Sequence, residues 1–107
     1  MMPWERSLVE TATSRNAVSI RLTDERWEHI AEEHSELGGM RSEVLRTVAD
    51  PARIYAGKAG ELLAAKEIES GKCLVVVYRE LRDDGFVITA FLTRRMAALE
   101  RRKQLCP

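Results

Sequence analysis

The two histidines of this chain lie five residues apart, in a segment whose apolar residues recur at helical spacing. Histidine changes its charge near neutral pH, so it is the side chain best suited to give and take a proton. Five residues correspond to about 140° around a helix, so His29 and His34 cannot face one ligand together. The i, i+4 spacing of zinc protease motifs is absent, and we expect no metal. Either histidine could act as an acid or base; the alternatives are a packing role for His34 and a solvated position for His29.

A second group of candidate residues lies in the sequence ITAFLTRR, at the end of the last predicted strand. Thr89, Phe91 and Thr93 share one face of that strand, because side chains alternate along it. Arg94 and Arg95 follow at once. A guanidinium offers a planar fork of donors that matches phosphate oxygens, and hydroxyls add neutral donors. The segment therefore predicts an anion site, although a strand that simply leads into a basic helix would have the same composition.

The elements that must position these residues begin with a short strand over 18–22, where apolar and polar residues alternate. Thr23 is then a plausible cap for a first helix, which ends at Gly38-Gly39. A second helix follows and ends at Asp50-Pro51, since the residue before a proline avoids the helical region.

Beyond residue 51 the apolar residues no longer recur at the spacing of a helix and recur instead at the spacing of a strand. Consecutive short connections imply an antiparallel meander, with one face covered by the helices. Its strands are expected at 53–56, 61–68, 73–79 and 86–92. The core LVVVY of the third strand is typical of a strand buried on both faces, and residues 94–104 return to helical composition.

Alternation in the last strand assigns its residues to two faces. The core face is predicted to carry Phe86, Ile88, Ala90 and Leu92, and the other face Val87, Thr89, Phe91 and Thr93. If that second face is open, it is a natural binding surface.

The expected fold is therefore α+β: a short strand and two N-terminal helices packed on an antiparallel sheet of about four strands, with a C-terminal helix. Hydrophobic residues make up 45% and charged residues 32% of the 107 residues, a balance typical of a globular protein. We expect residues 1–16 to form an N-terminal arm or short helix, and residues 17–107 to form a single domain. The two cysteines show neither a disulfide framework nor zinc spacing.

Charge is unevenly distributed along the chain. Residues 1–50 carry ten acidic and six basic residues, a balance of −4, and residues 51–107 carry eleven basic and seven acidic ones, a balance of +4. A basic face for an anionic partner and a solvated C-terminal helix are both compatible with this asymmetry. No apolar stretch approaches the roughly 18 residues that cross a membrane, and the N-terminus lacks the apolar core of a signal peptide. The predicted location is the cytoplasm, with no membrane contact.

Several of these segments recur together in a known family. LTDERWEHIAEEHSEL, VADPARIY, KCLVVVYRE and GFVITAFLTRR occur in this order over about residues 18–95, roughly three-quarters of the chain. Together they resemble the phage- and mobile-element-associated domains grouped with the barnase, EndoU, colicin and RelE-like nucleases. That family shares two histidines on the first helix, a polar residue before proline after the second, and a final TAF–x–T–R strand. Ser35 stands where the family commonly has proline.

The resemblance implies metal-independent cleavage of RNA without a cofactor. In that reaction the 2′-hydroxyl attacks the adjacent phosphorus and leaves a cyclic phosphate and a free 5′-hydroxyl. It needs an acid and a base, and a cation for the crowded phosphorane. His29 or His34 would be the acid or base, and Arg94, assisted by Arg53 or Lys66, would stabilise the charge.

The resemblance also implies a set of substrate contacts. Hydroxyls would position the phosphate, a second arginine would pair with it, and aromatic rings would stack a base. These residues are Thr89, Thr93, Arg95, Tyr55, Tyr78 and Phe91. RNA is the expected partner, with a neutralising protein or a second copy of the chain as a further one. The alternatives are a catalytically inactive relative that binds nucleic acid or protein, and a structural or self-associating domain.

Overall fold

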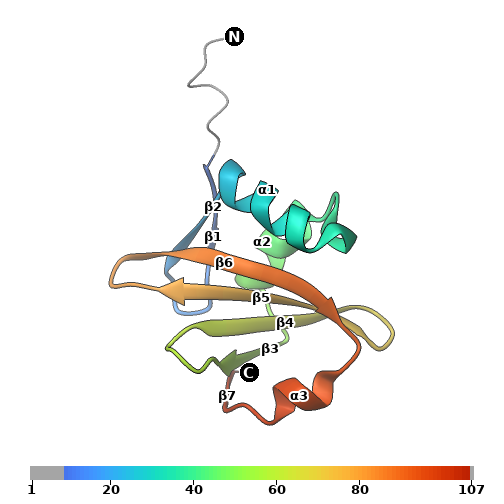
Figure 1. The fold of residues 1–107 in the computed structure, drawn as a ribbon. Coiled ribbons are helices and arrows are strands. Elements are labelled where there is room, and N and C mark those ends of the chain that lie inside the picture. Colours follow the sequence, from blue (N-terminus) through green and yellow to red (C-terminus); the bar gives the residue numbers. More distant parts are fainter. Residues whose placement is uncertain (1–8, 107) are drawn as a thin grey trace.

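Seven strands form one mixed sheet in the computed structural model of the chain, which describes residues 9–106 (Figure 1). The strands are β1 (Val9–Thr13), β2 (Ser19–Thr23), β3 (Arg53–Ala56), β4 (Leu62–Glu69), β5 (Lys72–Glu80), β6 (Asp84–Thr93) and β7 (Gln104–Cys106). Their order in the sheet is β1-β2-β6-β5-β4-β3-β7. Neighbours pair antiparallel, except that β2 and β6 run parallel.

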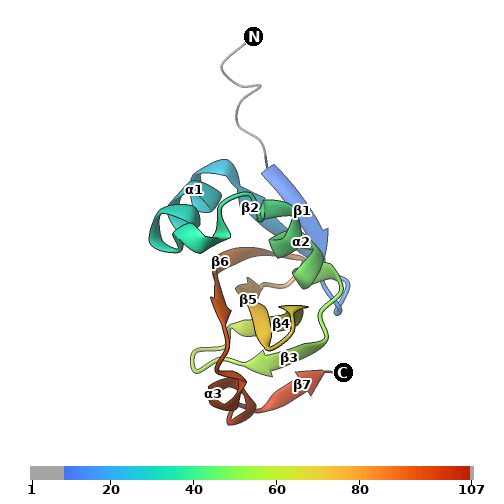
Figure 2. The ribbon, with the colours of Figure 1, turned by 90° about the vertical axis from the view of Figure 1, so that its right-hand side faces the viewer.

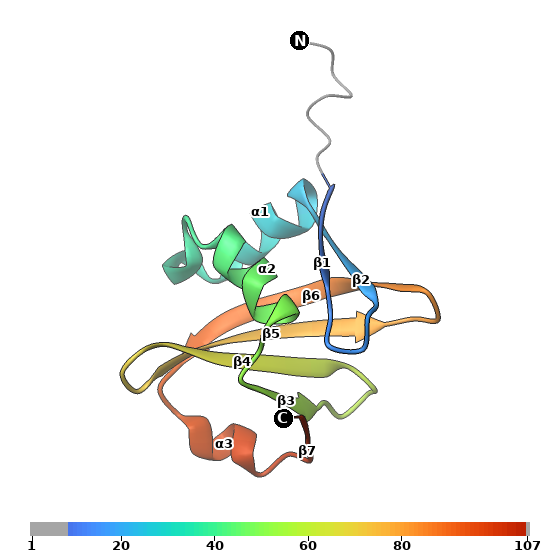
Figure 3. The ribbon, with the colours of Figure 1, turned by 180° about the vertical axis from the view of Figure 1, so that it is seen from behind.

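Three α-helices and one short 3-10 helix accompany this sheet: α1 (Asp24–Glu33), η2 (Ser35–Leu37), α2 (Arg41–Ala49) and α3 (Met96–Glu100). α1 and α2 lie with the β1–β2 hairpin at one end of the molecule, and α3 lies with β7 at the other (Figures 1 and 2). α2 contacts β1, β4 and β5, as the view from behind shows (Figure 3). None of the helices within residues 9–106 is long and apolar enough to cross a membrane.

The larger core lies between α1, α2 and one face of the sheet. Its buried residues are Ala12, Ile20, Leu22, Ile30, Leu37, Val44, Val48, Ala64, Leu74, Val76, Tyr78, Val87 and Ala90. A smaller cluster lies on the opposite face, under α3, and comprises Tyr55, Leu63, Ala65, Val75 and Leu99. Because successive residues of β5 enter these two clusters in turn, the predicted central strand is indeed buried on both faces.

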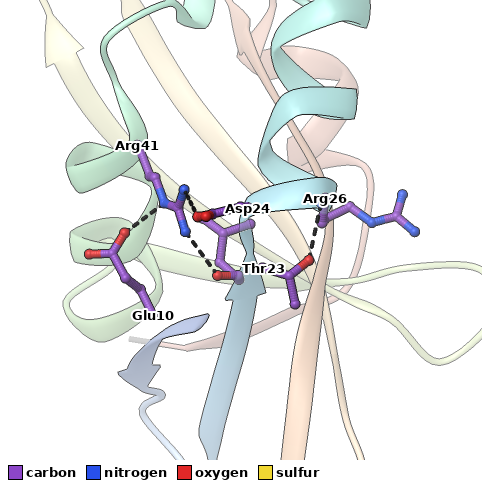
Figure 4. A network of polar contacts seen from close by, with 6 residues as sticks. Glu10, Thr23, Asp24, Arg26 and Arg41 are labelled. Atoms are coloured by element: carbon purple, nitrogen blue, oxygen red, sulfur yellow. Dashed lines mark hydrogen bonds and ion pairs between the residues drawn. The ribbon is translucent and has the colours of Figure 1, made fainter. Parts of the chain in front are cut away.

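One arginine ties the N-terminal hairpin to both long helices (Figure 4). Arg41, the first residue of α2, pairs through Nε with Glu10 of β1 at 2.6 Å and through Nη1 with Asp24 of α1 at 2.7 Å. Its Nη2 donates to the main-chain oxygen of Leu22 in β2 at 3.2 Å. Beside this network, the hydroxyl of Thr23 accepts from the N–H of Arg26 at 3.1 Å and caps α1, as predicted.

The structure is α+β, but the predicted arrangement within that class is wrong. The sheet has seven strands and one parallel pair instead of about four antiparallel strands. The helices are not N-terminal, because the β1–β2 hairpin precedes them. The predicted C-terminal helix over 94–104 shortens to α3, and the chain then pairs with β3 as β7. Residues 9–13 of the expected arm form β1, and residues 1–8 lie outside the described residues.

A β-bulge in β6 also changes the predicted assignment of its faces. Val77 of β5 pairs with Thr89, whereas Tyr78 pairs with Val87, so Ile88 is the extra residue. Alternation restarts after the bulge. Val87 therefore joins Ala90 and Leu92 on the face under α1 and α2, although strict alternation predicted that it would point the other way.

Candidate functional site

α3 and the sheet face beneath it enclose a groove of about 390 Å³. We call it the α3 groove. Its lining residues come from β4, β5, β6, the turn before β4, and the segment around α3. They are Glu61, Leu63, Val77, Phe91, Thr93, Arg95, Ala98, Leu99 and Arg102. The volume is within the range of small-molecule sites.

The floor of the α3 groove is apolar. Leu63, Val77 and Phe91 come from three adjacent strands, and the register places all three side chains on the face under α3. Leu99 of α3 is buried against the same face. An apolar floor that includes one half-buried aromatic ring is suited to a planar ring such as a nucleobase.

The exit of β6 supplies the groove with a hydroxyl and a guanidinium. The hydroxyl of Thr93 accepts from the main-chain N–H of Arg95 at 2.9 Å. This bond fixes the turn between β6 and α3, so that Arg95 lines the groove beside Thr93. Arg102 lines it from beyond the other end of α3. Two guanidiniums therefore flank the apolar floor, an arrangement that attracts anions.

His34 meets the groove at Phe91. It is the residue that ends α1, where its N–H donates to the oxygen of Ile30 at 2.8 Å. The His34 and Phe91 ring centroids lie 6.4 Å apart with a 40° tilt. Nδ1 of His34 lies 3.7 Å from a carboxylate oxygen of Glu36. His34 thus lies beside Phe91, which lines the groove together with Arg95, but His34 is not itself part of the lining.

Glu61 is the acidic member of the lining. Its Oε1 accepts from the N–H of Ala59 at 2.7 Å, within the β3–β4 turn. This bond is the main reason why the pKa of Glu61 is lowered, and the charges of Arg79 and Arg102 lower it further. Arg79 also donates to the main-chain oxygen of Ala59 at 2.7 Å and so holds the turn in place.

His29 lies on a different surface. Its ring pairs with Glu33 at 3.4 Å, and both side chains are more than half exposed. It lines a separate hollow of about 280 Å³ at the start of α1, together with Thr23, Glu25 and Arg26. The two histidines therefore do not share a site, as their spacing predicted.

Arg53 and Lys66 line a second cavity, of about 250 Å³, at the other side of α3. Its lining is Ala52, Arg53, Ala65, Lys66, Glu67, Cys73, Met96 and Glu100. The neighbouring Tyr55 side chain raises the pKa of Arg53, and burial raises the pKa of the Cys73 thiol. Lys66 lies 3.8 Å from Asp50. These two cations are thus placed apart from His34 and Arg95.

Four further candidates have other surroundings. Tyr78 is fully buried in the core under α1 and α2, and Tyr55 is 1% exposed, so neither ring can stack on a base in this structure. The hydroxyl oxygen of Thr89 is buried, with no hydrogen-bond partner among the described residues. Arg94 is exposed, and its guanidinium lies toward Gly71 of the β4–β5 turn.

Of the predicted residues, Phe91, Thr93 and Arg95 line the α3 groove, and His34 lies next to it, beside Phe91. Sequence reasoning missed Glu61 and assigned no role to Arg102. Arg102 contributed only to the positive charge balance of residues 51–107. Glu61 gave no signal, because its place in the groove depends on a turn and on the pairing of β3 with β4.

Within residues 9–106, no group of three or more His, Cys, Asp or Glu side chains could hold a metal ion. Comparison of the chain with protein-family models, with curated proteins and with solved structures finds no match.

Proposed function

We propose that this chain is an endoribonuclease that binds single-stranded RNA in the α3 groove and cleaves it without a metal ion. One observation carries the proposal: the His34 ring lies 6.4 Å from Phe91, which lines the same groove as Thr93 and Arg95. A stacking ring, a hydroxyl and a fixed cation therefore line one groove, and a proton carrier lies beside the ring. The resemblance of the sequence to the barnase, EndoU, colicin and RelE-like nucleases supports the same reaction.

Each group has a role in attack by the 2′-hydroxyl. Phe91 stacks a base, a contact that single-stranded RNA readers commonly use. His34 takes the proton of the 2′-hydroxyl as its oxygen attacks phosphorus, and Arg95 stabilises the charge on the phosphorane. The hydroxyl of Thr93 accepts from the main-chain N–H of Arg95, and its own proton can be donated to a phosphate oxygen. The 5′ oxygen leaves and takes its proton from solvent, because His29 lies elsewhere.

The test is incubation of the purified protein with unstructured and structured RNA in the presence of a chelator. We expect products with 2′,3′-cyclic phosphate and 5′-hydroxyl ends. His34→Ala should slow cleavage by about 10²–10⁴-fold, the usual contribution of a general base. His29→Ala is the matched control and should keep the wild-type rate, since its imidazole lies outside the groove. Equal rates for the two variants would contradict the assignment of the site.

A second candidate is an RNA-binding module without catalysis. It is favoured by the fact that His34 contacts Phe91 but is not itself part of the groove lining. Binding without cleavage in the chelator experiment would establish it. In that case Arg95→Ala should weaken RNA binding by about tenfold, the effect of losing a charge-assisted contact. Arg94→Ala, which changes the neighbouring exposed arginine, should weaken it much less.

A further inference from the structure

β1 forms one edge of the seven-stranded sheet, and no strand within residues 9–106 pairs with its outer side. We infer that this edge is an interface between two copies of the chain, whose β1 strands pair antiparallel about a two-fold axis at Thr11. The two sheets then join into one continuous sheet. The inference goes beyond the proposed function, because the lining of the α3 groove includes no residue of β1.

Three residues of β1 direct their main-chain N–H and C=O groups away from β2. The N–H of Ser14 donates to the oxygen of Val18 at 2.8 Å, so these residues form a hydrogen-bonded pair beside the hairpin turn. Such pairs alternate along antiparallel strands, and the register therefore directs the main-chain groups of Ala12 and Glu10 toward β2 as well. The residues between them direct theirs outward, where a further strand can bond to them. These outward residues are Val9, Thr11 and Thr13.

The outward residues match the same residues of a second copy. When two β1 strands run antiparallel about the two-fold axis, Thr11 lies opposite Thr11 of the second copy. Val9 then lies opposite Thr13 of that copy, and Thr13 opposite its Val9. All three are hydrogen-bonded pairs, in which the two residues exchange both of their main-chain bonds. The interface is isologous and closed, as in most homodimers.

The side chains are compatible with this register. Glu10 is the charged residue of β1 and lies opposite Ala12 of the second copy, so no like charges face each other. Its carboxylate already pairs with Arg41 at 2.6 Å on the side of α2. A shift that placed Glu10 opposite Glu10 would be disfavoured by repulsion. Val9, which is 53% exposed, gains a contact with the methyl group of Thr13.

The other edge of the sheet is protected against such pairing, whereas β1 is not. Edge strands commonly avoid self-association by being very short or by carrying lysine or proline. β7 has three residues, with Lys103 before it and Pro107 after its last residue. β1 has five residues and contains neither lysine nor proline. Its sequence therefore permits the pairing that the ends of β7 oppose.

Sedimentation equilibrium of the full chain measures the association directly. We expect the mass to rise with concentration from 12.2 kDa toward twice that value. A range from about 1 to 500 µM brackets the dissociation constants of weak interfaces, and an interface made by one short strand belongs to this class.

Thr11→Pro is the diagnostic variant, because it removes an outward N–H from each copy and keeps every main-chain bond to β2. Proline is also accepted on an edge strand when its nitrogen faces solvent. The Kd of the dimer should rise about thirtyfold, the effect of losing two hydrogen bonds of the usual net value. Thr11→Ser is the matched control. It keeps the N–H and should leave the Kd nearly unchanged.

Cysteine cross-linking tests the position of the two-fold axis. In Thr11→Cys the new thiols of the two copies lie on paired strands with Cα atoms about 5.5 Å apart, within reach of a disulfide. In Val9→Cys they lie about 13 Å apart, because Val9 is opposite Thr13, four residues along the strand. Under a mild oxidant we expect a disulfide-linked dimer from the first variant and not from the second. The wild-type chain gives the background from Cys73 and Cys106.

Three results would overturn the inference. One is a wild-type chain that keeps a mass of 12.2 kDa over the whole concentration range. Another is a folded Thr11→Pro variant that dimerises as tightly as the wild type. The third is cross-linking of Val9→Cys as fast as that of Thr11→Cys. If Thr11→Pro does not fold, the cross-linking pair decides, since cysteine keeps every main-chain N–H.

Discussion

Replacing Arg41 by alanine should destabilise the fold, because this side chain joins four elements of the N-terminal half. Its side chain is only 21% exposed. The bond to the Leu22 oxygen is worth about 1 kcal/mol, the net value of a typical hydrogen bond. The pairs with Glu10, which is 51% exposed, and Asp24, which is 34% exposed, contribute about 0.5 kcal/mol each after solvent screening. We therefore expect a loss of about 2 kcal/mol in the free energy of unfolding.

Urea denaturation followed by circular dichroism measures this loss directly. For a domain of this size, about 2 kcal/mol corresponds to a fall in Tm of roughly 10 °C. The matched control is Arg46→Ala on the same helix, since Arg46 is 67% exposed and its side chain pairs with Glu43, one turn away on that helix. It should cost about 0.5 kcal/mol or less. Equal losses for the two variants would refute the idea that Arg41 fastens the hairpin to the helices.

A double-mutant cycle separates the ion pairs from the main-chain bond. Glu10→Ala combined with Arg41→Ala should cost less than the sum of the single changes, because the two side chains share one interaction. Strict additivity would mean that the pair seen at 2.6 Å contributes nothing to stability.

Two other perturbations have clear expected signs. Gly85→Ala should destabilise the protein by about 3 kcal/mol, because the added methyl group would overlap the main-chain oxygen of Arg79. Gly71→Ala should cost about 1 kcal/mol, because Gly71 has a positive φ of 75° but an added methyl group would meet nothing closer than Nη1 of Arg94 at 4.0 Å; urea denaturation compares the two variants. The pKa of Glu61 is lowered on folding by the Ala59 amide, so its stabilising contribution is present above the unfolded-state pKa and disappears as the pH falls through the folded-state pKa. Glu61→Gln should therefore narrow the difference between Tm at neutral pH and Tm at about pH 3, and an unchanged difference would contradict the assigned cause.

The central part of the fold could be predicted from local patterns. The residues of LVVVY are apolar without alternation, and this pattern predicts a strand that is buried on both faces. The strand β5 is buried on both faces in the structure. The Thr23 cap locates the start of α1, and Pro51 locates the end of α2, since these residues act on the adjacent backbone. The predicted end of the first helix at Gly38-Gly39 is wrong, because α1 ends at Glu33 and the separate 3-10 helix η2 follows it.

The edges of the sheet could not be predicted in the same way. β1 is an edge strand with a single buried residue, Ala12, so it shows no apolar period. The three residues of β7 are too few to show one. The parallel pairing of β2 with β6 depends on residues far apart in the chain, and the bulge at Ile88 depends on the register between β5 and β6. Local periodicity contains neither kind of information.

About half of the residues of the candidate site could be predicted from residue types and their spacing in the sequence. The other half could be assigned only from the structure. Thr93 and Arg95 were expected together because they adjoin in sequence, and both line the α3 groove. Local sequence patterns could not show that His34, and not His29, lies next to that groove. This placement depends on the position of the end of α1 beside Phe91. Tyr78 was expected to stack a base, but β5 turns it into the core.

The parallel pairing of β2 with β6 also has a consequence for synthesis of the chain on the ribosome. The N-terminal hairpin is made early, but its strand neighbour in the finished sheet, at Asp84–Phe86, is translated after every other strand except β7. Antiparallel neighbours from β3 onward can meet soon after they are made, because short turns join them. The hairpin therefore lacks its β6 neighbour until β6 has been synthesised. We expect nascent chains that stop before β6 to remain sensitive to protease in their first quarter.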